Sequence, residues 1–162
     1  MAQLITATEI VQEASVYQNI DPEIIKVNFI EVSQEEHIRP VLTEDLYDLV
    51  VSENNSGTFT GLNETLLNTY IKPALAFMVM SDVVTLNAVR FADAGIMVNT
   101  SDTSESATRE ERADLSKKYQ KMGGTLIEKM QRYLEDNETS FSTWKNESSP
   151  YVPNKSTGGI IM

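Results

Sequence analysis

The run from Asn63 to Gly95 is the most hydrophobic part of the chain, and it limits the possible folds more than any other feature. Its large apolar residues recur at helical spacing but cover more than one face of the helix they predict: Leu66, Leu67, Tyr70, Ile71, Leu75, Met78, Val79, Leu86, Val89 and Phe91. With Asn63 as the cap and Gly95 as the stop, the pattern predicts a helix over residues 64–94. At 1.5 Å per residue this helix is about 45 Å long, with a bend at Pro73. It must be buried on most sides, within its own fold or against neighbouring copies.

Helix-start signals define two elements before it. The capping box Thr6-Ala7-Thr8-Glu9 predicts a first helix over residues 7–17. Asp21 followed by Pro22 predicts a second helix that runs to Arg39, where Pro40 stops it. The second helix is expected to bury one apolar stripe, made of Ile24, Val27, Ile30 and either Phe29 or Val32.

The rest of the chain alternates helices with long connections. Thr43 is expected to cap a third helix, and the Asn, Ser and Gly content of residues 53–61 predicts a loop. Phe59 in that loop is either a small hydrophobic contact or an anchor for a partner. Residues 96–107 predict a long irregular link, and a second capping box at Thr108 opens a last helix that reaches Asp136. Inside that helix, Gly123-Gly124 marks either a weak point or a close helix crossing.

These elements predict an all-α helical bundle with long central and C-terminal helices, over residues 1–137, followed by an extended C-terminal arm, residues 138–162. The arm is rich in Ser, Thr, Pro and Gly and cannot bury enough surface by itself to offset the cost of ordering it. One interpretation is that it docks on another subunit through its apolar side chains: Trp144, Tyr151, Val152, Ile160, Ile161 and Met162. The other is that it packs back on its own domain, with Trp144 and Phe141 as anchors.

The net charge of -11 is unevenly distributed. Residues 1–70 hold 12 acidic and 2 basic residues, whereas residues 71–162 hold 12 and 11. Sequence-specific DNA binding is not expected, because it needs clustered Lys and Arg to neutralise phosphates. The acidic half is either a solvated face or a surface that repels DNA or faces a basic partner. The one basic cluster lies on the last helix, at Arg109, Arg112, Lys117, Lys118 and Lys121, where it can complement the acidic half of a neighbouring copy.

Catalytic and metal-binding patterns do not appear in the sequence. The lone histidine, His37, has Gln34 three residues before it instead of the Glu of a di-iron motif, and no nucleophile elbow or phosphate-binding glycine loop occurs. The chain lacks Cys, which excludes disulfides and thiolate metal sites and is compatible with a reducing cytoplasm.

No secretory leader and no membrane span are expected, since the longest strongly apolar stretch, residues 74–80, is far shorter than the ~20 residues a span needs. We therefore predict no cofactor, no metal and no enzymatic activity.

Taken in order, the elements resemble those of the head-to-tail connector (adaptor) proteins of tailed bacteriophages. The resemblance covers roughly residues 4–145 and rests on helix ends and apolar positions in five stretches: ITATEIVQEASV, IDPEIIKVNFIEVSQEEHIRPVLTEDLYDLV, LLNTYIKPALAFMVMSDVV, GIMVNTSDTSES and LIEKMQRYLEDN. Family members often have glycine where this chain has Thr43.

The resemblance implies a structural virion protein that forms a dodecameric ring beneath the portal protein, in the neck between capsid and tail, and is assembled in the host cytoplasm. The ring would extend the channel through which genomic DNA passes without sequence-specific contacts, dock by the C-terminal arm, Tyr151 to Met162, and hold the next tail or neck component. Ring contacts would involve the 53–61 and 96–107 loops, with Phe59, Ile96, Met97 and Val98. The alternative is a soluble helical binding or assembly-regulating protein that forms no ring.

Overall fold

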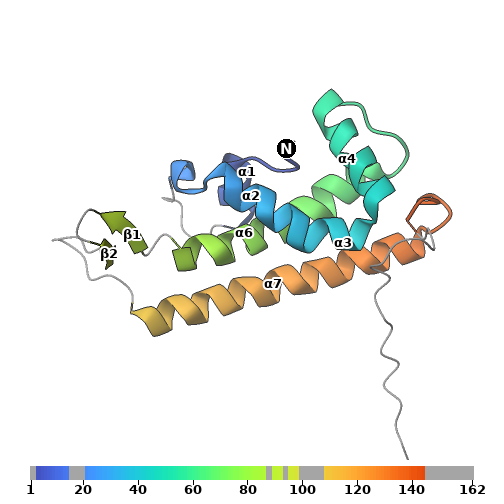
Figure 1. Ribbon diagram of the computed structural model, residues 1–162. Helices are drawn as coiled ribbons and strands as arrows, with labels where there is room; N and C mark the ends of the chain where they lie inside the picture. The colour runs from blue at the N-terminus through green and yellow to red at the C-terminus, as the bar shows by residue number, and fades with distance from the viewer. Residues whose placement is uncertain (1–2, 15–20, 87–88, 93–94, 99–107, 145–162) are drawn as a thin grey trace, which may run out of the picture.

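The protein is described by a computed structural model over residues 3–14, 21–86, 89–92, 95–98 and 108–144. Its helices lie in three layers: α6 is in the middle, α1 and α2 cover one side of it, and α7 runs along the other side (Figure 1). The predicted all-α helical bundle with long central and C-terminal helices is confirmed, with one short hairpin added. The elements in chain order are α1 (Ala7–Ala14), the 3-10 turn η1 (Pro22–Ile24), α2 (Val27–Ser33), the π-helical η2 (Gln34–Ile38), α3 (Arg39–Leu42), α4 (Glu44–Ser56), α5 (Asn63–Thr65), the π-helical η3 (Leu66–Ile71), α6 (Lys72–Leu86), β1 (Val89–Ala92), β2 (Gly95–Val98) and α7 (Arg109–Asp136).

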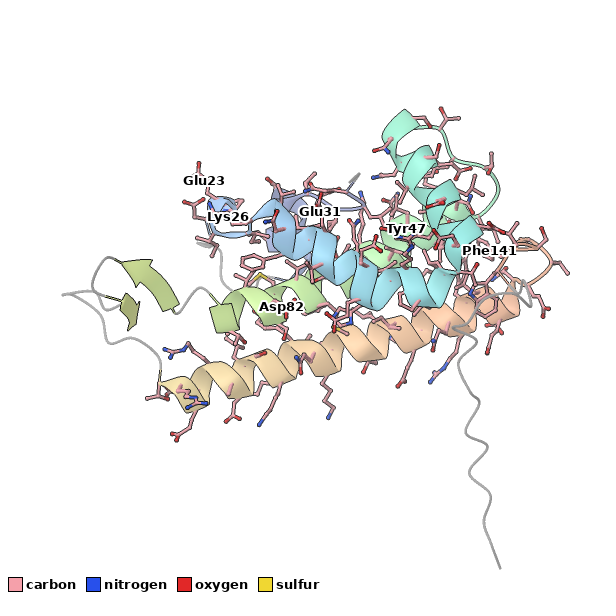
Figure 2. All side chains as sticks on the ribbon, viewed as in Figure 1. Glu23, Lys26, Glu31, Tyr47, Asp82 and Phe141 are labelled. Carbon is pink, nitrogen blue, oxygen red and sulfur yellow. The ribbon has the colours of Figure 1, made fainter. Side chains whose placement is uncertain are left out.

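Polar contacts tie the central helix to both outer layers. The Ser33 hydroxyl of α2 donates to the Asp82 carboxylate of α6 at 3.1 Å, and the Ser81 and Ser116 hydroxyls join α6 to α7 at 2.8 Å. Figure 2 shows Asp82 between the two outer helices. Because Ser81 and Asp82 are consecutive on one helix, they point about 100° apart and can reach different layers. The two contacts fix which sides of α2 and α7 face inward.

Gly123 marks a close helix crossing, one of the two interpretations that the sequence left open. A Cβ atom at this position would lie 3.0 Å from the side chain of Met78 on α6. The missing side chain therefore lets α7 approach the central helix closely.

The helix starts predicted at the two capping boxes are confirmed. Asp21, by contrast, caps only the 3-10 turn η1, and α2 begins at Val27 after Lys26, which provides no side-chain cap. Thr6 and Glu9 bond reciprocally at the start of α1, and Thr108 and Glu111 do the same at the start of α7. Burial raises the pKa of Glu9, but hydrogen bonds from Lys72 at 2.6 Å and from Thr6 outweigh it, so this pKa lies below its ordinary value. The Lys72–Glu9 pair thereby joins α1 to α6.

Both helix prolines are preceded by π-helical turns, and this corrects the prediction that Pro40 ends the second helix. η2 ends two residues before Pro40 and η3 ends two residues before Pro73. In each case the residue just before the proline, Arg39 or Lys72, donates its N–H to the carbonyl five residues back. This wider turn shifts the bonding register, so the helix can pass a residue that has no N–H and whose ring crowds the preceding turn. The α2–η2–α3 helix consequently continues to Leu42.

The long helix predicted over residues 64–94 extends eight residues, about two turns, beyond the helix in the structure. The α5–η3–α6 helix ends at Leu86, and the chain then forms an antiparallel hairpin in which Val89 pairs with Val98 and Ala92 with Gly95. Gly95 thus begins a strand instead of ending a helix, and residues 95–98 are not part of an irregular link. The segment is rich in β-branched and aromatic residues, which favour strands, and this preference prevailed over the helical spacing.

Two further predictions were wrong in detail. Ile30 is buried and Phe29 half-buried, as expected for an inward stripe, but Ile24, Val27 and Val32 are exposed. The third helix, α4, continues to Ser56, so the loop predicted over 53–61 is confined to residues 57–62. Leu62 occupies the cap position before α5, and Asn63 is the first helical residue.

The short loop after α4 is held by the buried carboxylate of Glu53. Gly57 ends the helix in the left-handed conformation, with φ 69°. The Glu53 carboxylate then accepts hydrogen bonds from the Thr60 N–H at 3.2 Å, from the Thr60 hydroxyl, and from the Asn63 amide at 2.7 Å. Phe59 in this loop packs against the core and is half-buried, which agrees with the small hydrophobic contact.

Candidate partner-binding site at the root of the C-terminal segment

The chain turns back on itself after α7. Asn137 caps the helix with its N–H and side-chain amide on the Tyr133 carbonyl, the latter at 2.9 Å. Ser140 and Phe141 then donate their N–H groups to the Asn137 carbonyl, and Trp144 donates its N–H to the Phe141 carbonyl at 2.9 Å. These successive turns direct the segment after Asn137 onto the helical body, at the end of α7 that lies beside α3 (Figure 1).

Phe141 and Trp144 anchor this segment in the core, with relative exposures of 3% and 8%. Phe141 meets Tyr133 edge to face at 5.9 Å between ring centroids, and Tyr133 stacks on Tyr70 at 4.3 Å. Figure 2 shows Phe141 beside α3 and α4. The second interpretation of the sequence, packing back on the chain's own domain, therefore describes residues 138–144. The predicted domain boundary at residue 137 matches the end of α7, but the next seven residues belong to the same packed body.

The Trp144 indole satisfies a carbonyl group at the end of α3. Its Nε1–H donates to the Val41 carbonyl at 2.8 Å. The last four carbonyls of a helix have no partner within the helix, and one that is left buried and unpaired is costly. Trp144 was predicted as a contact for a partner subunit, and the structure instead places it inside its own chain.

Thr43 links α3 to α4 in a conformation that threonine rarely adopts. Its φ is 68° and its ψ is 160°, and it is the one non-glycine residue with positive φ in the described ranges. The expectation that its side chain caps the third helix was wrong, because its hydroxyl donates to the Thr143 carbonyl at 3.5 Å instead. The strained link and the returning C-terminal segment therefore meet at one place. We call Val41, Thr43, Phe141 and Trp144 the C-terminal corner.

Arg39 braces the corner from the α3 side. Its guanidinium bonds the Glu35 carboxylate at 2.7 Å and the Glu44 carboxylate at 2.9 Å, and it lies 5.2 Å from the Tyr47 ring centroid. The hydrogen bond from Arg39 lowers the pKa of Glu44 below its ordinary value. Burial raises the pKa of Tyr47, whose hydroxyl accepts from the buried Gln34 amide at 3.3 Å. Arg39 thus clamps α4 to α3 across the Thr43 link.

Replacing Thr43 with glycine should stabilise the fold. Strain at such a backbone conformation costs about 1 to 3 kcal/mol, and glycine adopts it freely but loses about 0.5 to 1 kcal/mol of backbone entropy. We expect Thr43→Gly to raise the free energy of unfolding by about 1 kcal/mol, measured by denaturant titration. Thr43→Ala is the matched control: it removes the hydroxyl, keeps the Cβ atom and should bring no gain. A Thr43→Gly chain less stable than the natural one would contradict this account of the link.

The other predicted contact residues lie apart from the corner. Ile96, Met97 and Val98 belong to β2, in the hairpin at the opposite end of the body (Figure 1). Tyr151, Val152, Ile160, Ile161 and Met162 lie outside the described residues. The structure therefore does not gather the predicted site residues in one place.

The corner holds the start of the C-terminal segment against the body by ring packing and by the hydrogen bond from Trp144 to Val41. Across the described ranges, no cluster of three or more His, Cys, Asp or Glu side chains can hold a metal ion. Sequence reasoning missed Arg39 and Val41, and it interpreted Thr43 only as a helix cap. The available signal was that connector proteins, which the sequence resembles, often have glycine at the position of Thr43, since glycine adopts positive φ without strain.

The comparisons with known proteins identify the family of the chain but no individual related protein. A family model described as "Family of unknown function (DUF6712)" matches residues 38–153, from the end of η2 into the C-terminal segment. No curated protein and no solved structure matches significantly. The matched range contains the C-terminal corner in full. In the part of the chain that the structure describes, no helix is long and apolar enough to cross a membrane.

Proposed function

The chain belongs to the DUF6712 family, whose function is unknown, and we propose from its own residues that it is a structural connector between the portal and the tail of a bacteriophage. In this proposal twelve copies form a ring in the neck of the virion. The ring extends the DNA channel, docks on the portal protein through the C-terminal arms and carries the next tail component. The proposal assigns the protein no cofactor and no catalytic step.

The observation that carries the proposal is the fixed root of the arm. Phe141 and Trp144 hold the chain at the corner, so the 18 residues that follow Trp144 start from one defined point of the body. At ~3.3 Å per residue, a segment of that length spans up to about 60 Å when extended. It ends in Ile160, Ile161 and Met162, apolar side chains suited to a pocket on another protein. A firmly rooted arm loses less freedom on binding than one that begins in a flexible tail.

The charge of the chain suits a channel protein. The segment from Pro22 to Ser56 holds eight acidic and two basic residues. Arg39 is paired with Glu35 and Glu44, and Glu53 is buried, whereas Glu23, Asp45 and Asp48 are exposed. An acidic surface facing a lumen would repel the phosphates of passing DNA and prevent it from sticking. Sequence-specific contact with DNA is not part of the proposal.

Deleting residues 150–162 tests the role of the arm. We expect the shortened chain to keep its helicity by circular dichroism, because the corner ends at Trp144, and to lose binding to the portal ring in co-sedimentation. A matched full-length control replaces Ile160, Ile161 and Met162 with serine, which separates the loss of apolar anchors from the loss of length.

Undiminished portal binding by the shortened chain would contradict the proposed arm. A stable dimer that ignores the portal protein would favour the alternative, a soluble helical binding or assembly-regulating protein.

A further inference from the structure

The outward faces of α2 and α7 point in opposite directions. Ser33 of α2 and Ser116 of α7 both face α6, through Asp82 and Ser81 respectively. The opposite sides of the two outer helices must therefore point away from the body, one on each side, as the side chains in Figure 2 do. A copy of the protein stacked on another would bring these two faces together.

The outward face of α7 is basic with apolar side chains among the charges. Between residues 117 and 132 the helix carries five basic residues and one acidic residue, Glu128, and all six are exposed. Leu115 and Met122 are 43% and 48% exposed. Seven residues is close to two helical turns, so these two side chains lie on one line along the helix. We call this set the α7 stripe: Leu115, Lys117, Lys118, Lys121, Met122, Lys129 and Arg132.

The outward face of α2 has the complementary character. Val27 and Val32 are 53% and 57% exposed, among the most exposed large apolar side chains of the described residues. The carboxylates of Glu31 and Glu36 lie beside them in the sequence, and Figure 2 shows Glu31 on the side of α2 away from α7. We call Val27, Glu31, Val32 and Glu36 the α2 face.

We propose that the α7 stripe of one copy binds the α2 face of the next. Each face carries exposed apolar side chains among charges that are mainly of one sign. The α2 face is mainly acidic, with Lys26 as the base beside Val27, and the α7 stripe is mainly basic, with Asp114 and Glu128 as the acids near it. The prevailing signs are opposite, which favours a contact between the two faces. Two α7 stripes, or two α2 faces, would bring like charges together, so the contact is between unlike faces. A pair joined in this way keeps one unused face of each kind, one on each copy, and a contact of this type closes into a ring when the rotation per copy is suitable. The inference rests on the proposed ring for its biological setting and names the surface that would build it.

The absence of cysteine from the chain allows a direct test by disulfide trapping. Single cysteines are introduced at exposed apolar positions, Val32→Cys in one preparation and Met122→Cys in another. Under mild oxidation we expect the mixture to form cross-linked heterodimers at least tenfold faster than either preparation alone forms homodimers. A chain carrying both changes should form a ladder of higher oligomers. A disulfide needs Cβ atoms about 3.5 to 4.5 Å apart, so Val27→Cys and Leu115→Cys chains are also prepared. Each of the two α2 variants is mixed with each of the two α7 variants, which gives four pairings and covers the neighbouring register.

Two controls separate this contact from random collision. Leu49→Cys places a thiol at an exposed apolar position on α4, and its mixture with Met122→Cys should cross-link no faster than the single preparations. Adding Lys118→Glu and Lys121→Glu to the Met122→Cys chain should slow the specific cross-link about tenfold at low salt, because it reverses the charge of the stripe.

The inference is overturned if none of the four pairings cross-links above the Leu49 control, if the charge reversal has no effect, or if Met122→Cys alone gives the fast product. The experiment uses the full chain without portal protein. Its failure would therefore leave docking by the arm intact, whereas loss of portal binding would leave this contact intact.

Discussion

Trp144→Ala is expected to lower the free energy of unfolding by about 3 to 5 kcal/mol, the usual cost of removing a large buried aromatic side chain. Trp144 is 8% exposed, and its indole N–H satisfies the Val41 carbonyl at the end of α3. The substitution leaves a cavity and removes the donor that pairs this carbonyl. For a chain of this size the melting temperature should fall by about 10 °C, measured by calorimetry.

Trp144→Phe separates the two contributions. Phenylalanine keeps most of the ring but has no N–H, so its cost should be close to that of one lost hydrogen bond, about 1 kcal/mol. The arm that we propose to bind the portal protein would also lose its fixed root in Trp144→Ala, and its binding should weaken more than in Trp144→Phe. A loss of less than about 1 kcal/mol for Trp144→Ala would show that residues 138–144 are not anchored as described.

Glu53→Leu is expected to destabilise the protein by about 2 kcal/mol, because it leaves the buried Asn63 amide and two partly buried donors of Thr60 without their acceptor. The Glu53 carboxylate is the partner of the Thr60 N–H, the Thr60 hydroxyl and the Asn63 amide, and the residue is 6% exposed. Leucine fills a similar volume but accepts no hydrogen bond. The loop at residues 57–62 should also open, which amide hydrogen exchange at Thr60 and Asn63 can measure.

Glu53→Gln is the matched control for this site. Glutamine keeps one oxygen acceptor in place, so we expect it to retain part of the stability and the exchange protection at Thr60. Equal stability of the Glu53→Leu and natural chains in denaturant titration would mean that the donors find other partners, and that the carboxylate does not hold the loop.

Local signals in the sequence predicted where helices begin. Thr6, Asp21 and Thr108 are polar caps whose hydrogen bonds involve neighbours two or three residues away, so the relevant information is entirely local. The long apolar patterns likewise predicted the long central helix that includes α6 and the long C-terminal helix α7. These are short-range and periodic properties, which a single sequence contains in full.

The places where prediction failed depend on competition or on distant contacts. Pro40 was expected to end a helix, but the π-helical turn before it lets the helix continue. The sequence signals for helix ends do not predict such a turn. The hairpin at residues 89–98 arose where strand preference and helical spacing disagreed. The exposure of Val27 and Val32 could not be predicted from spacing alone, because it depends on which side of α2 meets α6.

The C-terminal corner shows the same limit for the candidate site. Trp144 could be recognised as an anchor, but the group it anchors to, the Val41 carbonyl, lies 103 residues earlier in the chain. The positive φ of Thr43 could not be predicted from the residue itself. The one indication was that connector proteins often have glycine at this position. The sequence thus identified Trp144 as an anchoring residue, but the group that Trp144 contacts could be identified only from the structure.

The central claim, that this protein is a ring connector docked by its arm, is tested most directly by the mass of its complex with a portal ring. Purified protein is mixed with a bacteriophage portal ring from the same source, and the mass of the complex is measured by light scattering on a sizing column. We predict a complex that gains about twelve subunits, consistent with the cyclic symmetry of such assemblies, and that is lost when residues 150–162 are removed. A portal ring whose mass is unchanged by an excess of the full-length chain would contradict the connector role.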